Sequence, residues 1–211
     1  MHGGNLVLLN ADNAEWVLES MLGALSNVEQ GFEKAAARAI NKTLGNGARI
    51  TARMVTSEFA VKQSEVLDKL SMRKATYSRV EGELNATGRG SLPLIRYAVG
   101  SAEPVPTMPK YYRTPKAERV KGVKVKVKKS SGVTMLQSAF LAEMDSGHVG
   151  VFERKDKDDM HSPITEMYGT SYLTYLQEDL VADELEEKVF ERFEHHLEHE
   201  ATFVLRKAGL R

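Results

Sequence analysis

Residues 78–86 read SRVEGELNA, and in this stretch the spacing of the apolar side chains changes from a helical period to a period of two. Every second residue from Val80 to Ala86 is small or apolar, and charged or polar residues stand between them. This alternation is typical of a strand with one buried face. Residues 93–99, PLIRYAV, predict a second and more buried strand, with Pro93 allowed at its first position.

Further strands are expected along the chain. In residues 123–128 valines alternate with lysines, and residues 140–144 and 148–154 predict a hairpin around the Asp-Ser-Gly turn at 145–147. No helical pattern interrupts these segments, so we expect the strands to pair in one antiparallel sheet. The sequence therefore predicts the α+β class, with N-terminal helices and a long C-terminal helix packed on a sheet of about five strands.

The helical pattern precedes these strands. A helix capped by Asp12 is expected to run to Gly45, where the Gly-Asn-Gly triplet at 45–47 breaks the pattern. Two shorter helices are expected over residues 48–59 and 64–70, the second capped by its first residue, a serine. The length of the chain fits a single α+β domain over residues 1–211.

A long C-terminal helix is expected over residues 171–207. Its apolar residues form a row at every fourth position: Val181, Leu185, Val189, Phe193, Leu197, Ala201 and Leu205. Each step of four drifts about 40° around a helix, so six steps drift about 240° and the row cannot face one flat sheet. We therefore expect part of the apolar face to remain for a partner, with Phe193, Leu197 and Val204 as candidate interface residues.

The segment 101–121 separates the second predicted strand from the third. It contains four of the six prolines of the chain and much of its most basic block. Because proline fixes φ and lacks a backbone N–H, we expect this segment to form a long extended loop.

The chain has no net charge, but its charges lie in blocks. Residues 110–129 hold nine Lys or Arg and one Glu, a net charge of +8. Residues 178–200 hold ten Asp or Glu and two Lys or Arg, a net charge of −8, and residues 31–79 carry a net charge of +6. Two interpretations stay open: the blocks are solvated faces of separate elements, or unlike blocks meet between copies in an oligomer.

Composition excludes several classes of protein. The chain of 211 residues has no cysteine, which excludes disulfides, thiolate metal sites and cysteine nucleophiles. Its hydrophobic content of 42% and charged content of 27% are ordinary for a globular chain. The longest uncharged run, 130–142, is too short and too polar to span a bilayer, and the apolar residues 6–9 lack the flanks of a signal peptide. We therefore expect no membrane partner.

Residues 194–200, EHHLEHE, are the candidate for a metal site. His195 and His199 share a helix face, but zinc needs three or four ligands. His196 stands where a zinc-protease helix has its glutamate. The sequence also lacks a nucleophile elbow and a phosphate-binding glycine loop. We therefore expect no catalytic residue, no metal and no cofactor.

Contact with DNA is a further possibility. The candidate DNA-facing residues are Arg113, Lys116, Lys124, Lys126 and Lys128. Such a stripe could neutralise backbone phosphates, and the neighbouring Tyr111 and Tyr112 could stack on bases. Alternatively, lysines on an edge strand prevent edge-to-edge pairing of sheets. The residues alone leave both interpretations open.

Three stretches carry a resemblance to a known family. They are 36–43 (AARAINKT), 122–127 (GVKVKV) and 139–154 (AFLAEMDSGHVGVFER), the last followed by 162–169 (SPITEMYG). In order and spacing, over roughly residues 30–180, the chain resembles the minor tail protein Z family of lambda-like phages, the tail completion proteins. One departure is that Thr170 follows Gly169 where the family usually has proline.

The motif residues of this resemblance are Arg38, Asn41, Thr43, Phe140, Gly147, His148, Gly150, Val151, Phe152, Arg154, Pro163, Ile164 and Gly169. The two glycines of the hairpin suit a tight turn and a close backbone approach, and Arg154 could hold a carboxylate. Packing and hinge roles are expected by default, and interface roles remain open.

The resemblance implies a structural virion protein without catalysis, at the head-proximal end of the tail of a long-tailed phage. It implies a ring of six copies that helps to complete the tail and to join it to the head. The implied partners are further copies of the chain, the tail terminator, the tail tube and the neck or connector proteins. Non-specific contact with genomic DNA in the lumen stays a possibility that the basic residues raise. Assembly is expected in the host cytoplasm.

Two alternatives stay open. The chain could be a basic DNA-contacting neck or packaging accessory protein, in which residues 110–129 face the genome. It could also be a morphogenesis factor that is absent from the finished virion.

Overall fold

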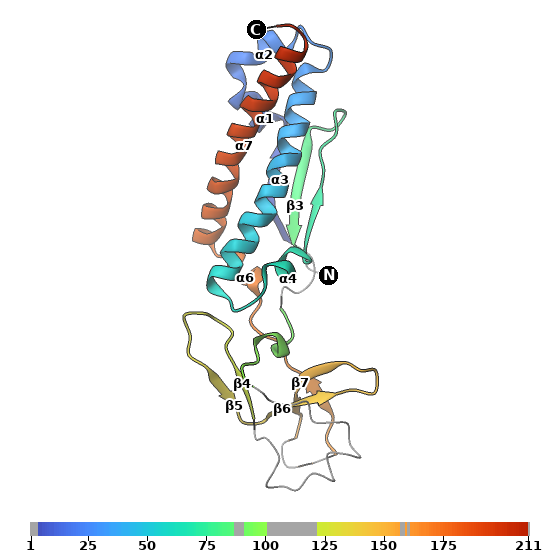
Figure 1. Cartoon of the computed structure of the whole chain (residues 1–211), viewed down its shortest axis with the longest axis vertical. Coiled ribbons are helices and arrows are strands. Elements are labelled where there is room, and N and C mark those ends of the chain that lie inside the picture. The colour runs from blue at the N-terminus through green and yellow to red at the C-terminus, as the bar shows by residue number, and fades with distance from the viewer. Residues whose placement is uncertain (1–3, 87–90, 101–121, 157–158, 160, 211) are drawn as a thin grey trace. The chain divides into compact units, whose positions relative to one another are not determined.

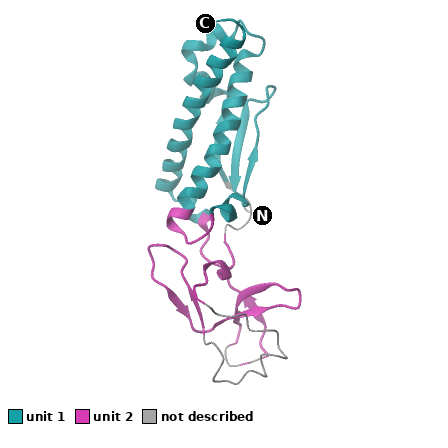
Figure 2. Ribbon diagram, viewed as in Figure 1, with its two compact units in different colours: residues 1–55, 63–90, 173–211 teal, residues 56–62, 91–172 magenta. Residues whose placement is uncertain are grey.

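A computed structural model describes residues 4–86, 91–100, 122–156, 159 and 161–210. The described chain is α+β, with helices and antiparallel sheets, which confirms the predicted class. It divides into two units (Figure 2): unit 1 comprises residues 1–55, 63–90 and 173–211, and unit 2 comprises residues 56–62 and 91–172. The single domain expected over 1–211 stays a prediction, and the expected loop 101–121 lies outside the described residues.

Unit 1 contains a three-stranded antiparallel sheet in the order β1–β3–β2. Its strands are β1 (Gly4–Asn10), β2 (Leu70–Arg73) and β3 (Glu81–Ala86). In the central strand β3 every second residue is buried, which confirms the predicted alternation. Gly82 of β3 lets the sheet approach helix α3 (Gly31–Glu58), because a Cβ there would lie 2.6 Å from Cγ2 of Ile40.

The N-terminal helical segment is broken, so the predicted continuous helix from Asp12 is wrong. It forms α1 (Ala11–Val17), the 3₁₀ helix η1 (Glu19–Met21) and α2 (Leu22–Leu25). The cap of α1 is Asn10, whose Oδ1 accepts the N–H of Asn13 at 3.0 Å, while Oδ1 of Asn13 accepts the N–H of Asn10 at 3.1 Å. Before α3, Gln30 has a φ of +52°, which no right-handed helix accommodates.

Helix α3 continues through the triplet 45–47, where a helix end was expected. Gly47 is buried against helix α7 (Asp179–Lys207), and a Cβ there would lie 3.4 Å from the side chain of Val189. Packing against α7 outweighs the roughly 1 kcal/mol that a glycine costs inside a helix. The short third helix is observed as α4 (Gln63–Leu67), and Ser64 lies within it.

Helices α3 and α7 lie side by side and antiparallel in unit 1 (Figure 1). The C-terminal helix predicted over 171–207 is in fact two helices, α6 (Tyr172–Leu176) and α7. They are separate because Glu178 has an extended backbone, with φ −65° and ψ 129°. Helix α7 also contacts α1 and α2, so its partners change along its length.

The interface role expected for Phe193, Leu197 and Val204 is wrong for the folded unit. Their exposed fractions are 0%, 0% and 5%, and all three belong to the hydrophobic core of unit 1. The apolar row of α7 does drift around the helix, but successive partners within the same unit cover it. The row is therefore core, and a surface for a partner has to be formed by other residues.

The described part of unit 2 contains two small antiparallel sheets. One pairs β4 (Val123–Val125) with β5 (Thr134–Leu136), and the other has the order β6 (Ala139–Glu143), β7 (Val149–Arg154), β8 (Ile164–Glu166). The predicted hairpin is confirmed, with Phe140 opposite Phe152. Gly147 occupies its turn with a φ of +78°, a conformation that favours glycine.

The expectation of one five-stranded sheet is wrong. The predicted strands that exist are distributed over three sheets of two or three strands each. Residues of the predicted strand 93–99 form instead the 3₁₀ helix η2 (Leu94–Tyr97), in which Leu94 and Tyr97 are buried. An apolar run of this length fits a buried turn of helix as well as a strand.

Candidate functional site

A buried carboxylate connects the two long helices of unit 1. Glu200 of α7 is 5% exposed, and its side chain forms ion pairs with Lys42 and, at 3.9 Å, with Arg38, both on α3. His199 Nδ1 lies 3.7 Å from the same carboxylate. A buried charge without a partner costs several kcal/mol. The motif residue Arg38 therefore helps to fix α3 against α7.

His196 faces α3 beside this ion pair. Its Nδ1 lies 3.0 Å from Oγ1 of the buried Thr43, and its Nε2 lies 3.2 Å from Nδ2 of Asn46. Because an amide NH₂ only donates, Nε2 accepts and Nδ1 carries the proton that is donated to Thr43. Burial lowers the pKa of His196, and the neighbouring His195 lowers it further, so the neutral ring is favoured.

Asn41 connects α3 to the segment between β2 and β3. Its Oδ1 accepts the N–H of Ala75 and its Nδ2 donates to the C=O of Ala75, each at 2.9 Å. Ala75 is buried, so the amide side chain satisfies a backbone that has lost its water. The polar residues of the first motif thus hold α3 to α7 and to the sheet.

The hairpin motif surrounds a contact between β7 and β8 in unit 2. Nε2 of His148 lies 2.8 Å from Oε1 of Glu166, and the histidine ring meets the ring of Phe152 edge-on at 6.4 Å. Gly150 leaves room for this pair, because a Cβ there would lie 2.8 Å from the same Glu166 oxygen. His148 remains half exposed, so this cluster reaches the surface of unit 2.

Arg154 packs on the same hairpin. Its guanidinium lies 5.5 Å from the centre of the Phe140 ring and donates a hydrogen bond to the carbonyl of Ser162 at 3.3 Å. The ring centres of Phe140 and Phe152 are 6.5 Å apart. Val151, which precedes Phe152 on β7, is fully buried. Within the described residues Arg154 therefore contacts an aromatic ring and a carbonyl, and a contact with a carboxylate stays a prediction.

The last motif residues differ in exposure. Gly169 lies against the buried Tyr97, where a Cβ would be 2.5 Å from Cε2 of the ring. Pro163 and Ile164 are exposed, Ile164 by 37%. Most of the motif residues are therefore packing residues, and those on the surface are candidates for contact with another protein.

Three of the five basic residues that are candidates for DNA contact lie within the described part of the chain. Lys124 is exposed on β4, whereas Lys126 and Lys128 follow the strand. Lys128 Nζ forms an ion pair with Glu58 at 3.1 Å and lies 5.7 Å from the ring centre of Phe59. Arg113 and Lys116 lie outside the described residues. Lys128 is thus engaged within the fold, and the DNA-facing role of these residues stays a prediction.

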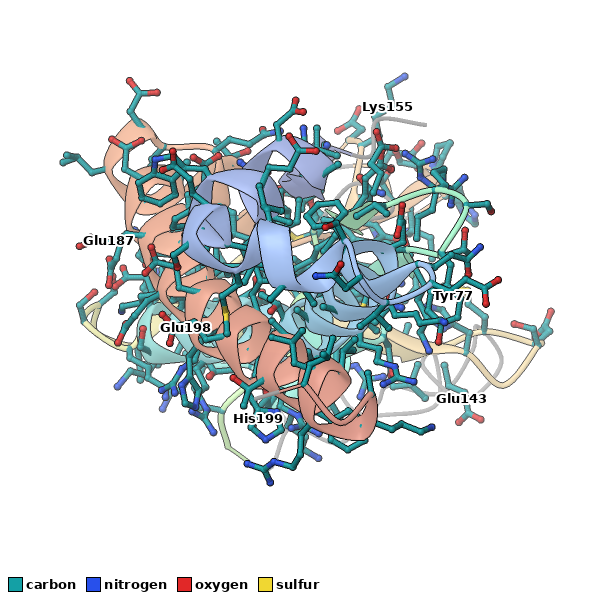
Figure 3. All side chains as sticks on the ribbon, turned by 90° about the horizontal axis from the view of Figure 1, so that it is seen from above. Tyr77, Glu143, Lys155, Glu187, Glu198 and His199 are labelled. Carbon is teal, nitrogen blue, oxygen red and sulfur yellow. The ribbon has the colours of Figure 1, made fainter. Side chains whose placement is uncertain are left out.

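Unit 1 has a groove between β1 and α7 that we call the acidic groove. Its volume is about 470 Å³. Its lining residues are Val7, Leu8, Leu9, Asn13, Asp183, Glu186, Glu187, Val189 and Phe190, with three carboxylates and no cation. Leu8 is 46% exposed, and the indole of Trp16, 67% exposed, lies 5.9 Å from the ring of Phe190. Glu187 projects outward from α7 (Figure 3).

A second groove, which we call the basic groove, lies between α3 and α7 in the same unit. Its volume is about 390 Å³. Its lining residues are Asn46, Arg49, Ile50, Arg53, Lys188, Glu191 and Arg192, a formal charge of +3. Neither groove was predicted from the sequence, although both follow helical spacing: residues 183, 186, 187 and 190 line one, and residues 46, 49, 50 and 53 line the other.

The described residues meet neither the requirements of a metal site nor those of a membrane-spanning helix. No group of three or more His, Asp or Glu side chains within them is placed to hold a metal ion. His195 and His199 instead line a shallow hollow with Phe203 and Arg206. No helix in the described ranges is long and apolar enough to cross a bilayer.

Comparison with protein families gives a match to the family described as prophage minor tail protein Z (GPZ), over residues 17–210. The chain belongs to the minor tail protein Z family. This confirms the resemblance drawn from the motifs, and the family is one of structural phage tail proteins rather than a known enzyme family. Comparisons with curated proteins and with solved structures gave no match.

Proposed function

We propose that this chain is a tail completion protein, which forms a ring at the head-proximal end of a phage tail and helps to join the tail to the head. Family membership over residues 17–210 is the observation that carries the proposal. A tail protein of this kind acts in the virion and contacts other tail or head components. A ring of six copies next to the tail terminator, the tail tube and the neck or connector proteins is part of the proposal.

The distribution of the motif residues supports a structural role. Arg38, Asn41 and Thr43 are used to hold α3 in place, and Phe152 and Gly169 are used in packing. A subunit that passes mechanical load between neighbours needs such fixed internal contacts more than a cleft for a small molecule. Its contacts with neighbours then come from exposed surfaces such as the two grooves of unit 1.

The experiment is removal of the gene from its phage or prophage, followed by electron microscopy of the lysate. We expect filled heads and free tails that are not joined, and recovery of infectious particles when purified chain is added to that lysate. A gold-labelled chain should mark the head-proximal end of the tail. Normal particles without the gene, or label at the distal tip, would contradict the proposal.

Two further measurements separate the alternatives. Mass spectrometry of purified particles should detect the chain, whereas a morphogenesis factor would be absent from them. A DNA-contacting accessory protein would shift duplex DNA at about 0.15 M salt and lose that shift when Lys124 and Lys126 are replaced by Glu. We expect no such shift, because Lys128 is engaged in an ion pair with Glu58 and Lys126 is only partly exposed.

A further inference from the structure

We propose that the acidic groove of one copy binds the basic groove of a second copy, so that copies associate head to tail. This inference rests on the proposed ring and names the surfaces that would form it. The two grooves have formal charges of −3 and +3, and both lie on unit 1. A second copy of the chain therefore offers each groove a surface of opposite charge.

The positions of the grooves favour a head-to-tail contact over a symmetric one. Glu187 lines the acidic groove and Arg192 lines the basic groove, five residues apart on α7. Five residues correspond to about 140° around a helix, so the two grooves open on opposite flanks of α7. A subunit with two unlike and differently directed surfaces can bind one neighbour with each, which generates rings or filaments.

Charge alone would not hold such an interface, because an exposed ion pair contributes only about 0–1 kcal/mol. The acidic groove also presents apolar surface, with Leu8 46% exposed, and its lining residue Phe190 lies against the indole of Trp16, which is 67% exposed. In the basic groove, Arg49 and Arg192 stand beside the apolar side chain of Ile50. An indole fits against such guanidinium groups by cation–π contact, and Trp and Arg are the residues that most often dominate interface energies.

The test uses two double variants of the whole chain. One, Asp183→Lys with Glu187→Lys, reverses the acidic groove, and the other, Arg49→Glu with Arg192→Glu, reverses the basic groove. All four positions are exposed, so both variants should fold, which their melting temperatures would verify. The matched control for the acidic-groove variant is Asp68→Lys with Glu198→Lys, which adds the same positive charge at exposed positions outside both grooves.

Association is measured by analytical ultracentrifugation up to ~200 µM, above the micromolar Kd of weak interfaces. We expect the wild type and the control to associate, and each groove variant alone to weaken association at least ~30-fold. Mixed together, the two variants should associate again, because the two retained grooves have opposite charges and so do the two reversed grooves. Trp16→Ala should weaken association of the wild type without unfolding it.

Several outcomes would overturn the inference. They are a wild type that stays monomeric throughout this range, groove variants that associate like the control, and folded variants that fail to combine when mixed. If Arg49→Glu with Arg192→Glu abolished binding to duplex DNA but left association intact, DNA would be the occupant of the basic groove. None of these results decides whether the chain completes tails, which the gene-removal experiment tests separately.

Discussion

The side chain of Asn41 forms two hydrogen bonds with the backbone of Ala75, thirty-four positions further along the chain, each at 2.9 Å. One amide group therefore satisfies both the donor and the acceptor of a buried residue in the segment between β2 and β3. This contact fixes that segment against α3, and it explains physically why an asparagine suits this position of the first motif.

Replacing Asn41 with Ala should destabilise the chain by about 2–4 kcal/mol, because two buried backbone groups lose their partners. Asn41→Asp should also destabilise, since the carboxylate oxygen that replaces Nδ2 cannot donate to the carbonyl of Ala75. Urea unfolding measures both effects. If Asn41→Ala is within 0.5 kcal/mol of the wild type, roughly the error of such differences, the contact is not maintained in solution.

Gly169 offers a test of packing in unit 2. A Cβ there would lie 2.5 Å from Cε2 of Tyr97, a ring that is only 2% exposed and has little room to move. Gly169→Ala should lower the free energy of unfolding by about 1–3 kcal/mol through overpacking. The matched control is Gly132→Ala, because a Cβ at that position meets nothing within 4 Å. Equal melting temperatures for the two variants would show that this part of unit 2 packs differently.

Tyr172 is fully buried, and its hydroxyl has no hydrogen-bond partner among the described residues. Tyr172→Phe removes this unsatisfied group, so at neutral pH the free energy of unfolding should stay the same or rise by about 1 kcal/mol. A loss of 1 kcal/mol or more would instead reveal a partner for the hydroxyl, because removing a satisfied group leaves its partner unpaired.

At alkaline pH, the wild type and Tyr172→Phe should also differ in stability. Burial raises the pKa of Tyr172 to about 12 in the folded chain, above the ordinary value of 10.0. A raised pKa gives stability that is complete below pH 10 and is lost as the pH rises toward 12. The wild type should therefore lose stability relative to Tyr172→Phe in this range, as urea unfolding at neutral and alkaline pH would measure. Parallel curves would contradict the burial of an ionisable hydroxyl here.

Local patterns in the sequence predicted individual strands and turns better than they predicted how the strands pair. The alternation before Ala86 and the Asp-Ser-Gly turn correctly predicted β3 and the β6–β7 hairpin, because both depend on neighbouring residues. The pairing of β3 with β1, 70 or more residues away, has no local signal. A period of two indicates that a strand exists and which face is buried, but not which strand lies beside it. The expectation of a single sheet was wrong for this reason.

The C-terminal helix shows a second limit. Its apolar row was correctly recognised, but the row was assigned to an external partner because it drifts too far to face one flat surface. Phe193 and Leu197 are instead fully buried, since different helices of the same unit cover successive parts of the row. Charged positions between the apolar ones, such as Asp183 and Arg192, form the exposed grooves. A sequence pattern of this kind cannot distinguish a neighbouring element from a neighbouring subunit.

His196 connects α3 and α7 in its neutral form, with Nδ1 donating to Thr43 and Nε2 accepting from Asn46. Protonation would place a second N–H against the NH₂ of Asn46, so the charged ring loses one contact. The pKa of His196 is lowered from 6.5, first by burial and then by the charges of neighbouring cationic groups. A lowered pKa gives stability that is complete above pH 6.5 and is lost as the pH falls below it.

The wild type should therefore lose stability relative to His196→Gln as the pH is lowered from roughly 7.5 to 5, the range in which an ordinary histidine titrates. Lys42, Arg192 and His195 oppose protonation of the ring, and Glu200 favours it. These groups are present in both proteins, so the difference between the two curves isolates residue 196. Urea unfolding at each pH provides the curves. If they stay parallel, His196 does not titrate differently on folding, and its contacts with Thr43 and Asn46 are not those of a partly buried neutral ring.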